Sequence, residues 1–152
     1  AGVATVVTKL FIQTDADYAM FGEKDYQQLK VVTRLASDLG MRIEVIGVPT
    51  IREPDGLAMS SRNAYLTRSE RAQAVAIHRS LTQAAEKIRG GMDPQKATRA
   101  AARSLTTLGF KVDYVTVRNA ETLAVPQTRN EPLRLLAAAW LGTTRLIDNL
   151  GV

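Results

Sequence analysis

Two short polar clusters in this sequence carry side chains that could bind a phosphate-rich ligand. The first, Gly22-Glu23-Lys24-Asp25, follows the apolar run of residues 18–21 and precedes a helical pattern. A helix start presents unpaired N–H groups and a partial positive charge, and Lys24 adds a mobile cation, so this junction favours an anion. Gly22 would let a ligand approach the backbone, Asp25 could accept from ribose hydroxyls, and Gln28 lies about one helical turn further on. An ordinary capped helix with a polar face would explain the same residues.

The second cluster is Ser60-Ser61-Arg62, between Met59 and Asn63. It offers two hydroxyl groups, which rotate to suit a ligand, and one guanidinium, which donates in a fixed fork. That combination suits a polyphosphate. An exposed, serine-rich loop that leads into a helix is an equally good interpretation on local grounds.

The other charged residues carry no comparable pattern. His78 lies in the middle of a helical pattern beside Ile77 and Leu81, which favours a partly buried or surface residue over a catalytic one. Five arginines of the second half have no regular spacing and are interpreted as solvated: Arg99, Arg103, Arg118, Arg134 and Arg145.

Composition excludes several classes of function. The chain has no cysteine and one histidine, which excludes disulfides, thiol catalysis and cysteine metal sites and disfavours a histidine metal site or a Ser-His-Asp triad. The net charge of +5 favours an anionic partner, but with three Phe and one Trp the stacking platforms of a nucleic-acid binder are missing. No apolar run is long enough for a membrane span and no signal peptide is visible. We therefore expect a cytoplasmic protein that binds a small anion.

The hydrophobic pattern of the first half of the sequence predicts alternating helices and strands. Val3, Val6, Val7 and Leu10 share one helical face, residues 18–21 form a short buried strand, and a helix capped by Asp25 runs to Gly40. Residues 43–48 form a second strand, so the pattern predicts a parallel α/β layer. Two parallel strands cannot make a stable sheet alone. The sequence also lacks an initiator methionine, and we expect the remaining strands to lie before Ala1.

The second half predicts a different architecture. Pro54-Asp55-Gly56 marks a turn, and Thr67 with Glu70 forms a capping box that opens a helix ending at Gly90. Asp93-Pro94 opens another helix, with Ala97, Ala101, Leu105 and Leu108 inward and Gly109 at its end. Strands are predicted at 112–117, 133–140 and 144–147, the last two joined by a hairpin. We therefore expect two domains, residues 1–66 and a small α+β domain with an antiparallel sheet, residues 67–152.

Four stretches stand out together: Phe21-Gly22-Glu23-Lys24-Asp25-Tyr26-Gln27-Gln28-Leu29, Gly47-Val48-Pro49, Asp55-Gly56-Leu57-Ala58-Met59-Ser60-Ser61-Arg62-Asn63 and Leu141-Gly142-Thr143-Thr144-Arg145-Leu146-Ile147-Asp148-Asn149. They closely resemble the motifs of the pantoate–β-alanine ligase (pantothenate synthetase) family, over nearly the whole chain. The resemblance implies the C-terminal part of a Rossmann-like nucleotide domain, similar to class I aminoacyl-tRNA synthetases, followed by a small α+β domain. Residues 1–66 would then be the ATP- and pantoate-binding part.

The resemblance also implies a reaction and its site. These enzymes adenylate pantoate with ATP and Mg2+ and then transfer the pantoyl group to β-alanine. By matching position, Lys24 neutralises charge at the α-phosphate, and Ser60, Ser61 and Arg62 hold the β- and γ-phosphates like a KMSKS loop. Gly22 and Asp25 lie at the ATP ribose, Glu23 is a further ATP-binding residue, and Ile51 and Met59 lie at the adenosine. Gln28 orients pantoate. Mg2+ is bound through the ATP phosphates, with no protein metal site, and the family suggests a homodimer without nucleic-acid or membrane partners.

Part of the family's site is missing from this sequence. The histidine pair of the HIGH type and a second pantoate-binding glutamine belong to the absent N-terminal half, and His78 stands in the wrong context to replace them. The loop of residues 13–17 also differs from the usual proline-containing version. We therefore expect the chain alone to be inactive. The alternative is a non-catalytic C-terminal domain that binds nucleotide weakly or associates with itself.

Overall fold

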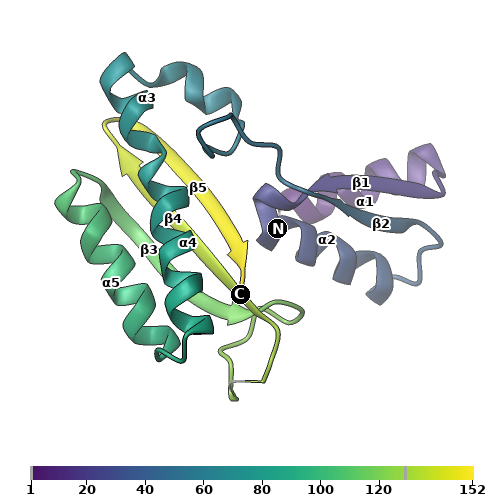
Figure 1. Cartoon of the computed structure of the whole chain (residues 1–152). Coiled ribbons are helices and arrows are strands. Elements are labelled where there is room, and N and C mark those ends of the chain that lie inside the picture. Colours follow the sequence, from purple (N-terminus) through teal and green to yellow (C-terminus); the bar gives the residue numbers. More distant parts are fainter. Residues whose placement is uncertain (1, 129) are drawn as a thin grey trace. The chain divides into compact units, whose positions relative to one another are not determined.

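A computed structural model of the chain describes residues 2–128 and 130–152 and divides into two compact units, Ala1–Thr50 and Ile51–Val152 (Figure 1). Residues 51–66 pack with the second unit in this division, because Leu57 belongs to its core and Arg52 pairs with its last strand. The domain boundary after residue 66 stays a prediction about the whole protein. In the part of the chain that the structure describes, no helix is both long and apolar enough to cross a membrane.

The first unit alternates helices and strands, as predicted. Its elements are α1 (Gly2–Thr14), β1 (Tyr18–Gly22), α2 (Tyr26–Asp38) and β2 (Glu44–Val48). β1 and β2 pair in parallel, with Tyr18 opposite Glu44 and Gly22 opposite Val48. α2 packs against this sheet, and α1 reaches it through an edge-to-face contact between Phe11 and Phe21. Gly40, with φ of +60°, ends the turn after α2, which confirms its predicted place.

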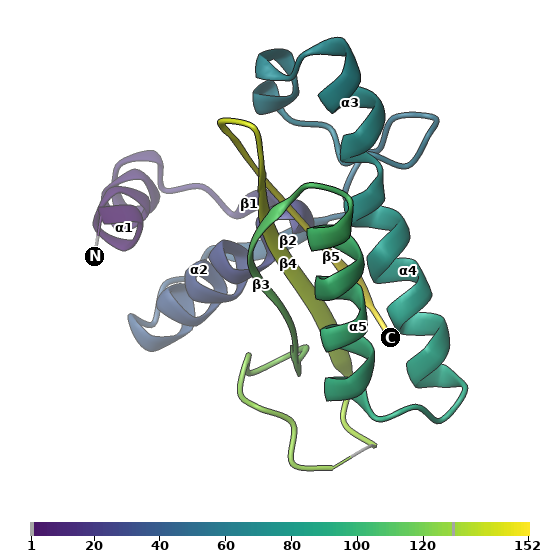
Figure 2. The ribbon, with the colours of Figure 1, turned by 90° about the vertical axis from the view of Figure 1, so that its left-hand side faces the viewer.

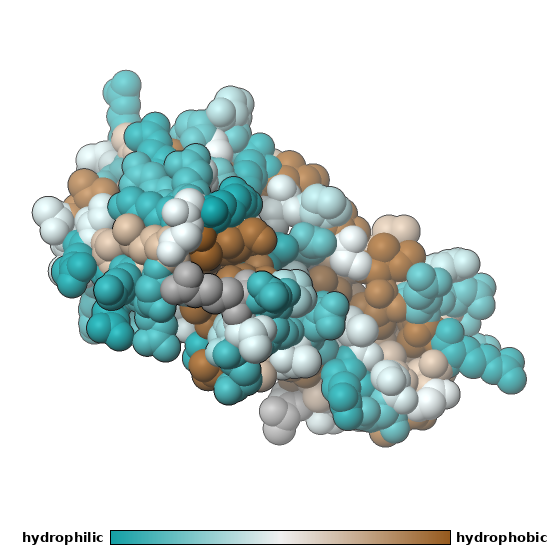
Figure 3. All heavy atoms as spheres, turned by 60° about the horizontal axis from the view of Figure 1, so that its bottom comes forward, coloured by the Kyte–Doolittle hydropathy of each residue, from teal (hydrophilic) through white to brown (hydrophobic). Residues whose placement is uncertain are grey.

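The predicted burial of this unit is partly wrong. Of the apolar face of α1, only Val7 is buried, while Val3 and Leu10 are about half exposed. β1 is a strand, but Tyr18 and Met20 are 61% and 73% exposed. Successive side chains of a strand point to opposite faces, so one face of the sheet carries these two residues outward. Hydrophobic residues, brown in Figure 3, also interrupt the hydrophilic surface of the molecule.

The second unit is the predicted α+β arrangement. Its elements are α3 (Arg68–Ala74), α4 (Ala76–Arg89), α5 (Pro94–Thr107), β3 (Lys111–Asn119), β4 (Leu133–Leu141) and β5 (Thr144–Gly151). The strands form an antiparallel sheet in the order β3-β4-β5. α4 and α5 lie side by side on one face of it (Figures 1 and 2). The single helix predicted from residue 68 to Gly90 is divided at Val75 into α3 and α4.

The core of the second unit lies between these helices and the sheet. Leu81, Leu105 and Leu135 are completely buried there. Both predicted caps are present: Thr67 and Glu70 form the capping box of α3, and Asp93 accepts from the backbone N–H of Lys96 at the start of α5. Leu108 was predicted to point inward but is 42% exposed, because it follows the last turn of α5 as its C-cap.

Candidate functional site

The strand-to-helix junction of the first unit is a compact polar turn. β1 ends at Gly22, a single 3-10 turn η1 (Glu23–Asp25) follows, and α2 begins at once. Asp25 was predicted to cap α2, but its side chain makes no capping hydrogen bond. It has φ of −92° and ψ of 57°, and its Oδ2 lies 3.3 Å from Lys24 Nζ instead. The physical reason is the 3-10 turn η1, which precedes α2 directly, so that the chain enters the helix from this turn and not from a side-chain cap at Asp25.

The predicted residues of this junction lie within one strand–turn–helix segment. The side chain of Lys24 is 18% exposed and that of Asp25 is 51% exposed, so Asp25 is the more accessible side chain of the pair. Gln28 is an exposed residue in the first turn of α2. Apart from its chain neighbours Phe21 and Glu23, no described residue of the first unit has an atom within 4 Å of where a Cβ on Gly22 would lie, so within this unit the backbone is open on that side.

Residues 51–59 of the second unit form a small hairpin. Met59 N donates to Ile51 O at 2.9 Å, and Arg52 and Ala58 form an antiparallel bridge. The predicted adenosine contacts Ile51 and Met59 are therefore direct partners across the hairpin. Their side chains are 68% and 51% exposed. At the tip, Gly56 has φ of +96°, a conformation that favours glycine and confirms the predicted turn.

The Ser60-Ser61-Arg62 loop emerges directly from this hairpin. Ser60 caps a 3-10 helix, η2 (Ser61–Tyr65), and its Oγ accepts from Arg62 N at 3.3 Å. Asn63 Nδ2 donates to Ala58 O at 3.0 Å, which ties the turn back to the hairpin. Ser61 and Arg62 are exposed. Among the described residues the Arg62 guanidinium makes no ion pair, so this loop offers a hydroxyl and a cation to an anion from solvent.

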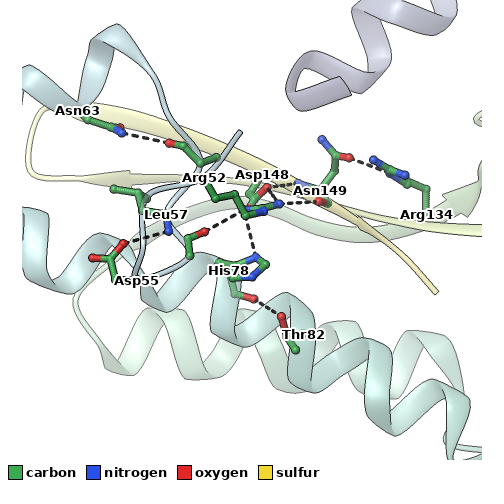
Figure 4. A network of polar contacts seen from close by, with 11 residues as sticks. Arg52, Asp55, Leu57, Asn63, His78, Thr82, Arg134, Asp148 and Asn149 are labelled. Carbon is green, nitrogen blue, oxygen red and sulfur yellow. Dashed lines mark hydrogen bonds and ion pairs between the residues drawn. The ribbon is translucent and has the colours of Figure 1, made fainter. Parts of the chain in front are cut away.

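An ion pair between a partly buried arginine and a buried carboxylate anchors the hairpin to the sheet (Figure 4). Arg52 Nη1 and Nη2 donate to Asp148 Oδ2 and Oδ1 at 2.8 and 2.9 Å, and Nη1 also donates to Gly56 O at 3.0 Å. His78 Nδ1 lies 3.4 Å from the same Asp148 Oδ2. We refer to Arg52, His78 and Asp148 as the Arg52 clamp. It joins three segments: the hairpin, α4 and β5.

The clamp controls the charge state of its carboxyl group. The Asp148 side chain is 2% exposed, and burial by itself would raise its pKa. The contacts with His78 and Arg52 and the backbone N–H of Asn149 outweigh burial, so the pKa of Asp148 lies below its usual range. Asp148 is therefore an ionised carboxylate at neutral pH, and its oxygens are held by several donors.

Two further contacts hold the hairpin in place. Arg71, on α3, donates to both carboxylate oxygens of Asp55 at 2.7 and 3.2 Å. At Gly56, a Cβ would lie 2.7 Å from His78 Cδ2, so the imidazole occupies the space that a side chain would need. The hairpin is thus fixed at its base by the clamp and at its tip by Arg71 and the His78 ring.

Sequence reasoning missed the clamp. The available signal was Asp148, a charged residue in the apolar strand pattern Leu146-Ile147-Asp148, because a buried carboxylate requires a partner. The partner itself, Arg52, is 96 residues away in the sequence. Four of the arginines interpreted as solvated are also engaged. Arg134 Nε donates to Asn149 Oδ1 and Arg145 Nε donates to Asp113 Oδ2, both at 2.7 Å. Arg118 Nη1 donates to Thr116 Oγ1 at 2.7 Å, and Arg99 Nη2 donates to Gln95 Oε1 at 3.2 Å.

Comparison with known proteins gives concordant matches. The sequence matches the family described as Pantoate-beta-alanine ligase over residues 1–151. It is 55% identical over 152 residues to a pantothenate synthetase of Nitrobacter hamburgensis and 55% identical to one of a Bradyrhizobium species. Each alignment covers 99% of this chain and 54% of the relative.

Solved structures agree with these matches. A pantothenate synthetase of Thermus thermophilus has a TM-score of 0.92 and 44% identity, over 98% of this chain and 54% of that one. A pantoate-beta-alanine ligase of Francisella tularensis, complexed with β-γ ATP and β-alanine, has a TM-score of 0.71 and 31% identity, over 99% of this chain and 49% of that one. The chain thus spans about half the length of the relatives that it matches.

Proposed function

The chain belongs to the pantoate-beta-alanine ligase family, and we propose that it supplies the phosphate-binding part of an enzyme that joins pantoate to β-alanine with ATP. The observation that carries the proposal is the family match over residues 1–151. The exposed hydroxyl and guanidinium of the Ser60-Ser61-Arg62 loop support it, because they suit the β- and γ-phosphates of a nucleotide. The Francisella tularensis relative, complexed with β-γ ATP, supports ATP as the nucleotide.

In the proposed first step, a carboxylate oxygen of pantoate attacks the α-phosphorus of ATP. The bond from that phosphorus to the bridging oxygen breaks, and pyrophosphate leaves with the electron pair. Lys24 neutralises the negative charge that gathers at the α-phosphate and the attacking carboxylate. Ser60, Ser61 and Arg62 hold the departing pyrophosphate. Lys24 belongs to one unit and the loop to the other, so the proposal requires both to act on one triphosphate.

In the second step, the amine nitrogen of β-alanine attacks the acyl carbon of the pantoyl adenylate. The bond from that carbon to the phosphate oxygen breaks, AMP leaves, and the ammonium loses its extra proton to form the amide. No protein nucleophile takes part. The contribution of this chain is positioning and electrostatic stabilisation of groups whose charge changes during the reaction.

The remaining predicted residues bind and orient the substrates. Gly22, with open space beside it, lets the ribose approach the backbone, and Glu23 and Asp25 lie beside it in the same turn. Ile51 and Met59, paired across the hairpin, present exposed apolar side chains for the adenosine. Gln28 holds the hydroxyl and carboxylate of pantoate through its amide.

We propose that Mg2+ enters this site with the ATP phosphates. Within residues 2–128 and 130–152, no group of three or more His, Asp or Glu side chains could hold a metal ion. When bound, the ion neutralises phosphate charge. Ser60, Ser61 and Arg62 would hold phosphate oxygens of the same ligand.

The test uses this chain joined behind the N-terminal portion of the Nitrobacter hamburgensis relative. Lys24→Ala should lower the rate of pantoate-dependent pyrophosphate release by at least about a hundredfold, since one lost charge-stabilising group typically costs about 3–4 kcal/mol of barrier. Lys9→Ala, which removes an exposed lysine from α1, is the matched control and should leave the rate unchanged. A near-normal rate in Lys24→Ala would refute the assigned role.

Calorimetry on the 152-residue chain separates the alternatives. A nucleotide-binding module gives a saturable heat when ATP is added, whereas a structural, self-associating domain gives none. We expect weak saturable binding without pyrophosphate release, because the chain covers only about half of the length of its relatives.

A further inference from the structure

We propose that the Arg52 clamp is a positioning device for the Ser60-Ser61-Arg62 loop. The inference rests on the proposed function, because it concerns the same phosphate-binding loop. The clamp residues do not touch the nucleotide in this proposal. They fix the hairpin of residues 51–59, and the hairpin fixes the direction in which the loop leaves it.

A short path of bonds connects the clamp to the loop. Arg52 Nη1 bonds both Asp148 and the carbonyl of Gly56, so one guanidinium holds the start of the hairpin and its tip. Across the hairpin, Met59 N donates to Ile51 O, next to Arg52 in the chain. Ser60 follows Met59 directly. A rotation or shift of Arg52 relative to β5 is therefore transmitted to Ser60 through backbone that has little freedom.

The anchor is rigid although the loop is exposed. Asp148 lies on β5, which pairs with β4 in register from Arg134–Gly151 to Leu141–Thr144. Its carboxylate is also fixed by the backbone N–H of Asn149 at 2.8 Å. A bidentate arginine–carboxylate pair fixes orientation as well as distance, because both partners are planar. The clamp thus holds the hairpin, and the exposed loop that follows it, in a fixed position relative to β5.

Net stability does not account for the clamp by itself. Replacing a buried ion pair by apolar residues of similar size is often neutral or stabilising, since the pair must offset the desolvation of both charges. The hairpin also has an apolar attachment in Leu57, which is 5% exposed and belongs to the core. What an apolar pair cannot reproduce is the set of directional bonds from Arg52 to Asp148 and Gly56.

The test uses the intact 152-residue chain, with NMR as the readout. Amide exchange is measured at Met59, Arg62 and Asn63, and affinity is measured from shifts on titration with MgATP and with AMP. The first variant is Arg52→Lys, which keeps the charge and loses the fork. The second is the double variant Arg52→Met with Asp148→Leu, which removes the hydrogen bonds of Arg52 to Asp148 and Gly56 and fills the site with apolar side chains of similar size. Arg145→Lys, which alters an ion pair elsewhere on β5, is the control.

We expect faster amide exchange at Met59, Arg62 and Asn63 in both clamp variants. In the control, Arg145→Lys, the exchange rates of these amides should equal those of the wild type. The ratio of ATP affinity to AMP affinity should fall about tenfold, by analogy with the loss of a side chain that orients a metal ligand. Amides of α4 and α5 should keep their protection, which shows that the unit is folded. A merely structural role would be restored by the apolar pair, and the ratio would then be normal.

Two results would overturn the proposal. The first is unchanged loop exchange in the folded clamp variants, and the second is faster exchange with an unchanged ATP-to-AMP ratio. The proposed function fails if the unaltered chain binds neither nucleotide, either alone or joined behind the N-terminal portion of the Nitrobacter hamburgensis relative, and the clamp then has no ligand to position. That outcome is seen in the wild-type titration, whereas failure of the clamp alone is seen only in the variants.

Discussion

Substitution of Gly56 by alanine tests the close approach of the hairpin tip to His78. Gly56 and Gly91 have nearly the same positive φ, +96° and +91°. Of these two glycines, only Gly56 would bring a Cβ against a neighbour, His78 Cδ2 at 2.7 Å, whereas at Gly91 no atom of the described residues lies within 4 Å. Gly91→Ala is therefore a matched control that shares the backbone strain and lacks the contact.

The expected magnitudes follow from these two contributions. A non-glycine residue in such a conformation costs on the order of 1–3 kcal/mol, and both variants share this cost. Forcing a methyl group into a filled site adds about 1–3 kcal/mol, and only Gly56→Ala should show this addition. The hairpin cannot simply swing away, because Arg52 bonds both Asp148 and the carbonyl of Gly56, and Arg71 holds the neighbouring Asp55.

Urea unfolding followed by tryptophan fluorescence measures the difference. Trp140 is the only tryptophan and lies on β4, so its signal reports the unit that contains both glycines. The free energy of unfolding should be lower in Gly56→Ala than in Gly91→Ala by about 1–3 kcal/mol. Adding His78→Ala to Gly56→Ala should recover most of that difference, since it removes the group that the methyl strikes. Equal values for the two glycine variants, within about 0.5 kcal/mol, would refute the reasoning.

Three further predictions use the same unfolding assay. The pKa of Asp148 is lowered by folding, so its stabilising contribution is complete above the ordinary carboxyl range and is lost as pH falls through the folded pKa. Between about pH 6 and pH 3, the free energy of unfolding should therefore fall more in the wild type than in Arg52→Met with Asp148→Leu. Equal losses would contradict this. Thr67→Ala should cost about 1 kcal/mol because it removes the capping box, whereas Thr67→Ser should cost much less, and equal costs would argue against the cap. Leu81→Ala, at a completely buried position, should lower the free energy of unfolding by about 2–5 kcal/mol. Leu108→Ala should change it by no more than about 0.5 kcal/mol. A large loss at Leu108 would mean that this side chain packs inward after all.

The elements that the sequence predicted well are those with local signals. Helical periodicity, the capping box at Thr67, the proline after Asp93 and the glycine turns depend on residues within a few positions of one another. The parallel pairing of β1 with β2 followed from the helix between them. These features could be predicted because short-range physics determines them.

The parts that the sequence did not predict depend on distant contacts or on competition between local structures. The Arg52–Asp148 pair joins residues 96 positions apart, and nothing near either residue identifies the other. Asp25 has the residue type of a cap, yet a 3-10 turn takes that place. Leu108 continues the apolar stripe of α5 but follows the last helical residue, where the backbone turns away. The candidate site residues were identified by resemblance, and their joint action on a nucleotide stays a prediction.

The separation of Arg52 from Asp148 also has a consequence for how the protein is made. Chains are synthesised from the N-terminus at about 5–20 residues per second, so the anchor of the hairpin is added roughly 5–20 s after the hairpin itself. During that interval the guanidinium of Arg52 has no buried carboxylate to pair with. The Arg52–Asp148 ion pair can therefore form only after β5 has been synthesised, so the hairpin of residues 51–59 gains this anchor late in the folding of the chain.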